Sequence, residues 1–383
     1  MPAPRDQRDG ARERAVSRRA TLGLVGGAAI VLALGLVVRF EPALALSAVL
    51  AAPRLEGWLA RVSREPVCET VSLPVGSRRL EADLYRPASR APTGPVVLVH
   101  GLSRAGRHQV ELTRLARLLA REGKLVLVPQ LEGLAAFRLS GDEVEDIRAS
   151  ARYLADLTHA PVAIAGFSFG AGPALLAAAD LPGVRVVGAF GGYADLRNVI
   201  VYVTTGVFTF HRQRYHRRQE EYNRWKLLAL LVGFVESGPD RARLTAIADR
   251  KLADPSAAIE DLEHGLGEEG RAVTALVRNR REDSVDPLID RLSPAARAAL
   301  ARLSPLAAVP RLSGRLLIAH GADDDSIPFT ESLRLAEAAG GRSSAAIFRT
   351  FHHTGPEPRG SPVGARAADA WNLFRIADEL LAR

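Results

Sequence analysis

One serine of this sequence stands in a pattern that suits nucleophilic chemistry. Ser168 is the centre of Gly-Phe-Ser-Phe-Gly, residues 166–170, which directly follows the apolar run VAIA and precedes an Ala- and Leu-rich stretch. On a sharp turn from a strand to a helix a serine hydroxyl is exposed, and small residues two positions away on either side avoid collisions. The pattern predicts a nucleophile at a strand end; the alternative interpretation is a glycine-rich turn with an incidental serine.

A serine hydroxyl needs a neighbouring base, and that base is usually oriented by a carboxylate. Three adjacent aspartates, residues 323–325, follow the apolar run 315–319, and two adjacent histidines, His352 and His353, follow the run 345–351. Asp195, just after the run 184–190, is another candidate acid. With either acid the chain order is serine, aspartate, histidine, which suits one catalytic group after each of several strands.

The other histidines and the single cysteine give no sign of a metal or a cofactor. His100 and His320 lie at the ends of expected strands, where we expect hydrogen-bonded structural roles. The pair His352 and His353 lacks a further histidine or carboxylate motif at ligand spacing. Cys68 is the only cysteine, which excludes an internal disulfide and a cysteine-rich zinc site. No metal site is predicted and no cofactor is implied.

Alternating apolar runs and helical stretches must position these residues. Continuous apolar runs predict buried parallel strands, and the stretches between them have helical character. The runs cover residues 96–100, 125–129, 162–165, 184–190, 315–319 and 345–351, and the helical stretches lie near 109–121, 142–157, from 173 onward and near 365–381. Residues 69–73 and 80–85 predict a preceding hairpin. We therefore expect an α/β domain with a mostly parallel sheet and helices on both faces.

Four motifs resemble those of the α/β-hydrolase superfamily, over about residues 67–192 and 310–383. They are VLVHG at residues 97–101, Gly-Phe-Ser-Phe-Gly, the spacing of Gly321, Asp324, Ile327 and Pro328, and the histidine after the last strand. The resemblance implies an α/β-hydrolase fold with Ser168 as nucleophile, Asp324 as orienting acid and His353 as general base. It further implies an oxyanion hole formed by the backbone N–H groups of Leu102 and Phe169. Asp195 and His352 remain the alternates.

The activity that this resemblance implies is that of a serine hydrolase. Such an enzyme cleaves a carboxylic ester or thioester through an acyl-enzyme intermediate, with a small, lipophilic acyl compound as substrate. Two alternatives use the same fold: a membrane-anchored binding protein without catalysis, and an acyltransferase that uses the same triad.

A membrane segment is expected near the N-terminus. Residues 20–38 are nineteen residues without a charge, close to the length that spans a bilayer as a helix. Six arginines precede this run within twenty residues, whereas only Arg39 and Arg54 follow it within the same distance. The excess predicts a single span with a cytoplasmic N-terminus and the catalytic domain outside. The alternative is export with cleavage near Ala43-Leu44-Ala45, after a partial twin-arginine signal at residues 17–22.

The net charge of +8 gives little support for nucleic-acid binding. The first nineteen residues hold +3 of the surplus, and the rest is spread over more than 360 residues. We therefore expect the membrane and a small molecule as partners, and no nucleic acid.

The long segment between the two parts of the sheet is expected to be a helical cap. Its apolar runs 199–210 and 227–235 enclose a basic stretch. They suit a lid over an acyl pocket, a membrane-resting surface, or ordinary helices with a solvated basic face, and the last is the simplest interpretation. The predicted units are a basic tail (1–19), a transmembrane segment (20–38), a linker (39–66), a first core part (67–192), the cap (193–312) and a second core part (313–383).

Overall fold

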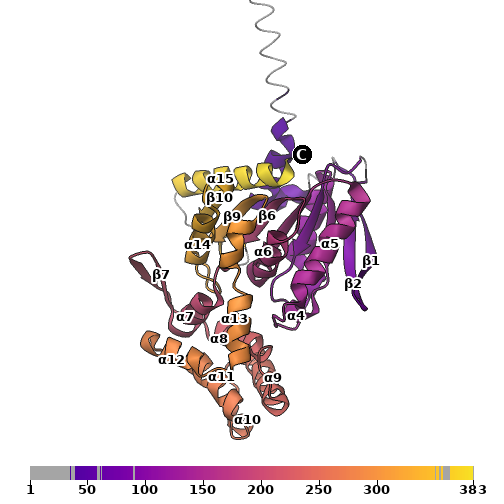
Figure 1. Cartoon of the computed structure of the whole chain (residues 1–383). Coiled ribbons are helices and arrows are strands. Elements are labelled where there is room, and N and C mark those ends of the chain that lie inside the picture. Colours follow the sequence, from indigo (N-terminus) through magenta and orange to yellow (C-terminus); the bar gives the residue numbers. More distant parts are fainter. Residues whose placement is uncertain are drawn as a thin grey trace, which may run out of the picture.

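The core of the protein is one eight-stranded sheet (Figure 1). The computed structural model describes residues 35, 39–57, 61, 63–88, 91–349, 351–352, 355–356 and 363–382. The strand order is β1-β2-β4-β3-β5-β6-β9-β10, in which β1, β2 and β4 pair antiparallel and all other pairs are parallel. The strands are β1 (Val67–Val75), β2 (Arg78–Arg86), β3 (Pro95–Val99), β4 (Leu125–Pro129), β5 (Val162–Phe167), β6 (Val184–Phe190), β9 (Arg315–Gly321) and β10 (Ser343–Phe348). The predicted mostly parallel sheet is confirmed.

Alternate residues of the central strands face two separate hydrophobic clusters. In β3, Val97 and Val99 join the cluster on one face, whereas Val96 and Leu98 join the cluster on the other. The first face is covered by α5 (Asp142–Thr158), α6 (Ala171–Ala179) and α14 (Thr330–Ala339), and the second by α3 (Val110–Arg121) and α15 (Val363–Leu381). Burial on both faces explains why these strands are continuous apolar runs in the sequence.

The segment between β6 and β9 forms a separate layer at the lower end of the molecule in Figure 1. We call residues 193–312 the cap. Its helices are α7 (Leu196–Thr205), α8 (Glu221–Val232), α9 (Gly238–Ala253), α10 (Glu260–Glu263), α11 (Glu268–Arg278), α12 (Val285–Asp290) and α13 (Pro294–Arg302). Apolar residues of α7 and α8, among them Ile200 and Leu228, are buried in the first cluster. Their burial therefore joins the cap to the same hydrophobic cluster as one face of the sheet.

We had expected a helical cap, but part of the cap is a β-hairpin. Strands β7 (Val207–Phe210) and β8 (Gln213–His216) form a two-stranded hairpin that projects from the cap (Figure 1). Phe208 pairs with Tyr215 across it, and their rings stack with centroids 5.1 Å apart. Cross-strand aromatic pairs stabilise such ribbons. Sequence patterns miss this hairpin because its strands have four residues each and its two-residue turn contains neither glycine nor asparagine.

The predicted membrane segment, residues 20–38, lies outside the described residues except for Gly35. Among the helices that the structure does describe, none has the length and apolar character needed to cross a bilayer. Residues 39–51 form a helix where we had expected a linker. Ala43, Leu46 and Val49 are buried in the second cluster, and Arg39 forms an ion pair with Asp378 of α15 at 2.6 Å. This helix is therefore docked on the domain.

The remaining described elements are short. They are α4 (Glu132–Ala135), β11 (Phe351–His352), β12 (Gly355–Pro356) and the 3₁₀ turns Pro53–Leu55, Gly106–His108, Ser168–Gly170, Glu282–Ser284, Pro305–Arg311 and Gly340–Arg342.

Candidate active site

Ser168 lies on a strained turn between β5 and α6. Its φ angle is +52°, in the left-handed region that residues with a side chain rarely adopt. The preceding strand ends at Phe167, and the residues after it pass through a 3₁₀ turn directly into α6. Such a backbone conformation costs on the order of 1–3 kcal/mol and is retained when the surrounding structure enforces it. The strand, turn and helix expected around the serine are therefore present.

Three glycines allow the backbone to close around this serine. A Cβ on Gly166 would lie 2.6 Å from Cα of Ala171, and a Cβ on Gly170 would collide with the carbonyl oxygen of His100. A Cβ on Gly101 would lie 2.9 Å from Cβ of Ser168. Larger residues at these positions would force the strand, the helix and the loop after β3 apart. The glycines at residues 166 and 170 therefore have the steric role that the sequence indicated.

Asp324 lies in the loop after β9 and is almost completely buried, with 3% of its surface exposed. Its Oδ1 accepts hydrogen bonds from the backbone N–H groups of Ser326, at 2.8 Å, and Ile327, at 2.9 Å. A Cβ on Gly191, the first residue after β6, would lie 3.6 Å from Oδ2 of Asp324. The carboxylate is therefore held beside the end of β6, the strand next to β5, which Ser168 directly follows.

Asp195, the alternate acid, has a structural role in this fold. It is the N-cap of α7, and its Oδ1 accepts from the backbone N–H of Arg197 at 2.8 Å and from Oγ of Ser304 at 3.2 Å. N-cap carboxylates satisfy the free N–H groups of a helix start. The Asp195 carboxylate is therefore hydrogen-bonded to other residues of the cap.

The two candidate bases, His352 and His353, follow the last strand of the main sheet. Strand β10 ends at Phe348, three residues before the expected end. His352 belongs to β11, which pairs with β12, and His353 lies outside the described residues. The choice between the two histidines therefore remains a prediction.

The backbone around the expected oxyanion hole lies close to the serine. Phe169 is in the first turn after Ser168, where helical N–H groups lack partners within the helix. Leu102 follows Gly101, whose backbone approaches the Ser168 side chain as described above. Two such N–H groups on the same side of a nucleophile can stabilise a negatively charged oxygen. Their role as an oxyanion hole remains a prediction.

His100 and His320 have the hydrogen bonds expected of structural residues. Nδ1 of His100 donates to the carbonyl of Gly101 at 2.8 Å, and Nε2 accepts from the N–H of Leu131 at 3.1 Å. Burial lowers the pKa of His100. Nε2 of His320 donates to the carbonyl of Ile327 at 3.0 Å and lies 3.3 Å from Oδ2 of Asp324, while Nδ1 is 2.7 Å from Oγ of Ser332. His320 therefore supports the loop that carries Asp324.

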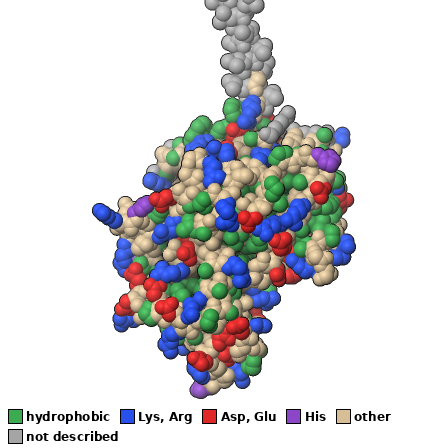
Figure 2. Space-filling model, viewed as in Figure 1, with side chains coloured by type: hydrophobic (Ala, Val, Ile, Leu, Met, Phe, Trp, Pro, Cys, Tyr) green, Lys and Arg blue, Asp and Glu red, His purple; other side chains and the backbone are tan. Residues whose placement is uncertain are grey.

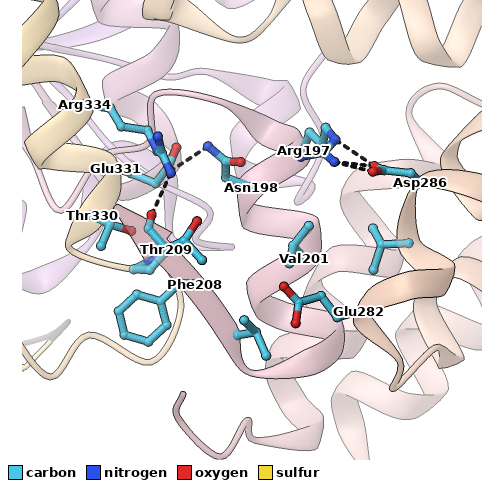
Figure 3. A pocket seen from close by; sticks show the side chains of 13 residues that line it. Arg197, Asn198, Val201, Phe208, Thr209, Glu282, Asp286, Thr330, Glu331 and Arg334 are labelled. Carbon is cyan, nitrogen blue, oxygen red and sulfur yellow. Dashed lines mark hydrogen bonds and ion pairs between the residues drawn. The ribbon is translucent and has the colours of Figure 1, made fainter. Parts of the chain in front are cut away.

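A pocket of about 180 Å³ lies where the cap meets α14, and neither Ser168 nor Asp324 lines it (Figure 3). In Figure 3, Asn198 and Arg334 converge on Glu331, a fully buried carboxylate of α14. Burial raises the pKa of Glu331. Sequence reasoning did not single out Glu331, because a glutamate in an amphipathic helix carries no distinguishing pattern.

Charges on the molecular surface are mixed. Figure 2 shows blue basic and red acidic side chains interspersed over the visible face of the core and the cap. Among the described residues no group of three histidine, cysteine, aspartate or glutamate side chains could hold a metal ion. Within the basic stretch of the cap, Arg214 forms an ion pair with Glu282 at 2.8 Å, and Arg217 forms one with Asp323. Some of these arginines therefore have specific partners.

Comparison with known proteins identifies the family. A family model described as "Alpha/beta hydrolase family" matches residues 96–362. The chain belongs to this family, in agreement with its strand order and the turn at Ser168. A search of curated proteins finds no significant match.

Several solved structures are similar to this chain at low sequence identity. An acylaminoacyl peptidase of Pyrococcus horikoshii is 14% identical, with a TM-score of 0.48 over 78% of this chain and 39% of that one. A puromycin-hydrolyzing peptidase of Mycobacterium tuberculosis is 18% identical, with a TM-score of 0.46 over 83% of this chain and 38% of that one. An esterase domain from a Rhodothermus marinus protein is 17% identical, with a TM-score of 0.42 over 75% and 90%. The chain thus spans about two fifths of the length of the two peptidases.

Proposed function

We propose that this protein is a serine hydrolase that cleaves a carboxylic ester or thioester through an acyl-enzyme intermediate. Ser168 is the nucleophile, His353 the general base and Asp324 the carboxylate that orients it. The backbone N–H groups of Leu102 and Phe169 stabilise the oxyanion.

The observation that carries this proposal is the left-handed backbone of Ser168 at the end of a central strand. A strained conformation is a reason to expect function, since nothing in an ordinary strand-to-helix connection requires a serine in it. The close approach of Gly101 to the same side chain supports an oxyanion hole there. The buried Asp324 at a nearby strand end supports its role as the acid.

The proposed reaction has two acyl transfers. Oγ of Ser168 attacks the carbonyl carbon while its proton moves to the histidine, and the tetrahedral intermediate then expels an alcohol or thiol that takes this proton. Water, deprotonated by the same histidine, attacks the acyl-enzyme and releases the carboxylic acid and the free serine. No cofactor takes part in these steps.

We also propose a small, lipophilic acyl compound as substrate. Leu102, Phe167 and Phe190 are partly exposed apolar residues at or beside the carboxyl ends of β3, β5 and β6. The rings of Phe167 and Phe190 are 5.2 Å apart. Apolar surface next to a nucleophile suits an acyl chain better than a charged group.

Labelling and hydrolysis test the catalytic proposal. The full-length protein and its Ser168→Ala variant are incubated with a fluorophosphonate probe and with p-nitrophenyl esters of short and long acyl chains. We expect labelling and hydrolysis only with serine present, and a loss of kcat on the order of 10⁶ in the variant. Equal rates from both proteins would refute the proposal, and silence with every probe would favour the binding protein. Product analysis with added alcohols separates hydrolysis from acyl transfer.

We further propose that residues 20–38 anchor the protein in the membrane, with the N-terminus in the cytoplasm and the catalytic domain outside. The alternative cleavage site, residues 43–45, lies inside the docked helix 39–51, where Ala43 is buried. Cleavage there would remove Arg39 and its ion pair with Asp378. The docked helix therefore supports an uncleaved anchor.

Carbonate extraction and N-terminal sequencing test the anchor. We expect the protein to remain with the membrane fraction and to retain residues 20–38. A soluble protein that begins near residue 46 would show that the segment is a cleaved signal.

A further inference from the structure

The loop that carries Asp324 is held by the cap. We call residues 322–329, between β9 and α14, the acid loop. Within it, Asp324 accepts the N–H bonds of Ser326 and Ile327, and these bonds fix the carboxylate relative to its own loop only. On the sheet side, His320 of β9 contacts Asp324 and Ile327 of this loop. The other polar contacts described here come from the cap.

Four consecutive residues of the acid loop have polar partners in the cap. The hydroxyl of Tyr202 donates to the carbonyl of Asp324 at 2.7 Å. The Asn223 amide donates to the carbonyl of Asp325 at 2.9 Å, and its Oδ1 accepts from Oγ of Ser326 at 3.2 Å. Nζ of Lys226 lies 3.2 Å from the same Ser326 oxygen, and Arg217 donates to the carbonyl of Asp323 at 2.6 Å. The cap therefore contacts the loop on both sides of the acid.

Two of these partners are buried, so their geometry is restricted. Tyr202 of α7 has no exposed surface and Asn223 of α8 has 4%. The Tyr202 ring packs edge-on against Phe208, and Phe208 packs in the same way against Phe329 at the end of the acid loop. Burial raises the pKa of Tyr202, so its hydroxyl stays a neutral hydrogen-bond donor.

A second connection fixes α7 to the helix that follows the acid loop. Oε2 of Glu331 accepts from the backbone N–H groups of Ala194, at 3.0 Å, and Asp195, at 2.8 Å. Oε1 accepts from the Asn198 amide at 3.0 Å (Figure 3). The start of the helix that carries Tyr202 is therefore joined to α14, and Tyr202 and the acid loop form one connected unit.

We propose that Tyr202 and Asn223 are positioning residues for catalysis. By holding the acid loop they keep the Asp324 carboxylate directed at the general base, so the cap is required for the triad geometry in addition to any role in covering the substrate. This inference rests on the proposed function. The carboxylate of a triad orients the imidazole and stabilises its charged form, so a displaced loop should lower kcat and leave substrate binding largely intact.

Two variants and a matched control test this proposal in the full-length protein. Tyr202→Phe removes the hydroxyl that holds Asp324, and Asn223→Asp removes the donor to Asp325 but retains the oxygen that accepts from Ser326. The control is Tyr193→Phe, which removes a buried hydroxyl that donates to the carbonyl of Leu303 at 3.0 Å, away from the acid loop. Hydrolysis of a p-nitrophenyl ester is measured as kcat and KM from pH 5 to pH 9, with melting temperatures for all proteins.

For Tyr202→Phe and Asn223→Asp we expect kcat to fall about tenfold to a hundredfold with KM changed less than about threefold. In Tyr202→Phe, which adds no charge, the acid limb of the kcat/KM profile should move to lower pH, since a less well placed carboxylate stabilises the imidazolium less. Tyr193→Phe should lower the melting temperature about as much as the other two variants do, but its kcat and pH profile should stay close to those of the wild type.

Several results would overturn the proposal. Wild-type kcat and pH profile in a folded Tyr202→Phe variant, or wild-type kcat in a folded Asn223→Asp variant, would show that the contacts are structural only. An equal loss of kcat in Tyr193→Phe would show the same. If Tyr202→Phe does not fold, Asn223→Asp decides between the outcomes. If the wild type fails to label with a fluorophosphonate, the proposed function itself is wrong, which distinguishes this case from a failure of the positioning role alone.

Discussion

Ser168 and Asp324 stand at the ends of two strands of one sheet, but they are held in place by different means. The serine is positioned by its immediate neighbours, because Gly166 and Gly170 allow β5 and α6 to meet at a strained turn. The aspartate is held by its neighbours Ser326 and Ile327, and its loop has further hydrogen bonds from the cap, about a hundred positions away in the chain.

This difference determines which changes should damage each half of the site. The turn at Ser168 depends on the space around its backbone, so added atoms should disturb it. The acid loop depends on hydrogen bonds from a separate layer, so removed polar atoms should disturb it.

The largest effect is expected at the proposed base. His353→Ala should lower kcat on the order of 10⁶, because the serine then lacks the group that removes its proton. His352→Ala should retain kcat within about tenfold of the wild type. Steady-state hydrolysis of a p-nitrophenyl ester measures both variants. A larger loss in His352→Ala would assign the base to that residue.

The next largest effect is expected at the proposed acid. Asp324→Asn should lower kcat about 10⁴-fold, since an amide holds the imidazole in the wrong tautomer. Asp195→Asn should have nearly wild-type kcat, because asparagine is also a good N-cap for α7. The same kinetic measurement compares the two variants, and the reverse order of effects would identify Asp195 as the acid.

At the turn, an added methyl group should reduce stability. In Gly170→Ala the new Cβ collides with the carbonyl of His100, so the free energy of unfolding should fall by about 1–3 kcal/mol. Gly341→Ala is a matched control, because a Cβ there has no neighbour within 4 Å, and its effect should stay within about 0.5 kcal/mol. Urea denaturation measures both; equal stabilities would show that the turn can relax.

The smallest effect is expected from the carboxylate that joins α14 to the cap. Burial raises the pKa of Glu331 above its ordinary value of 4.5, so the folded protein holds this proton more tightly than the unfolded chain does. Its contribution to the free energy of unfolding therefore decreases as the pH rises above about 4.5, by at most about 1.4 kcal/mol per pH unit. Glu331→Gln should lack this slope in urea denaturation between pH 4.5 and 7, and an unchanged slope would contradict the assignment.

The central sheet and its helices could be predicted from the sequence because burial on two faces leaves continuous apolar runs. The prediction of a helix at residues 142–157, for example, matches α5 (Asp142–Thr158). The hairpin β7–β8 could not be predicted, since its strands are short and are stabilised by the contact of Phe208 with Phe329 from another part of the chain.

The site divides in the same way. Ser168 could be recognised because the glycines that it needs are adjacent in sequence. Among the three adjacent aspartates, only the spacing to Gly321, Ile327 and Pro328 favours Asp324 in the sequence. The fold adds a second difference, because it buries Asp324 and leaves Asp323 exposed. The cap contacts of Tyr202 and Asn223 could not be predicted at all, because no sequence pattern indicates which distant backbone carbonyl a side chain will meet.

The docked helix 39–51 affects how the end of the domain that carries Ser168 and Asp324 would face its surroundings. It begins immediately after the apolar run 20–38 and packs beside α15, at the end of the molecule away from the cap (Figure 1). A helix packed in this way leaves little freedom for the domain to swivel about its tether. With residues 20–38 in a bilayer, as proposed, the end of the domain that carries the cap would point away from the lipid. Substrates would then reach the proposed site from solution or from an opposing structure more readily than from that lipid.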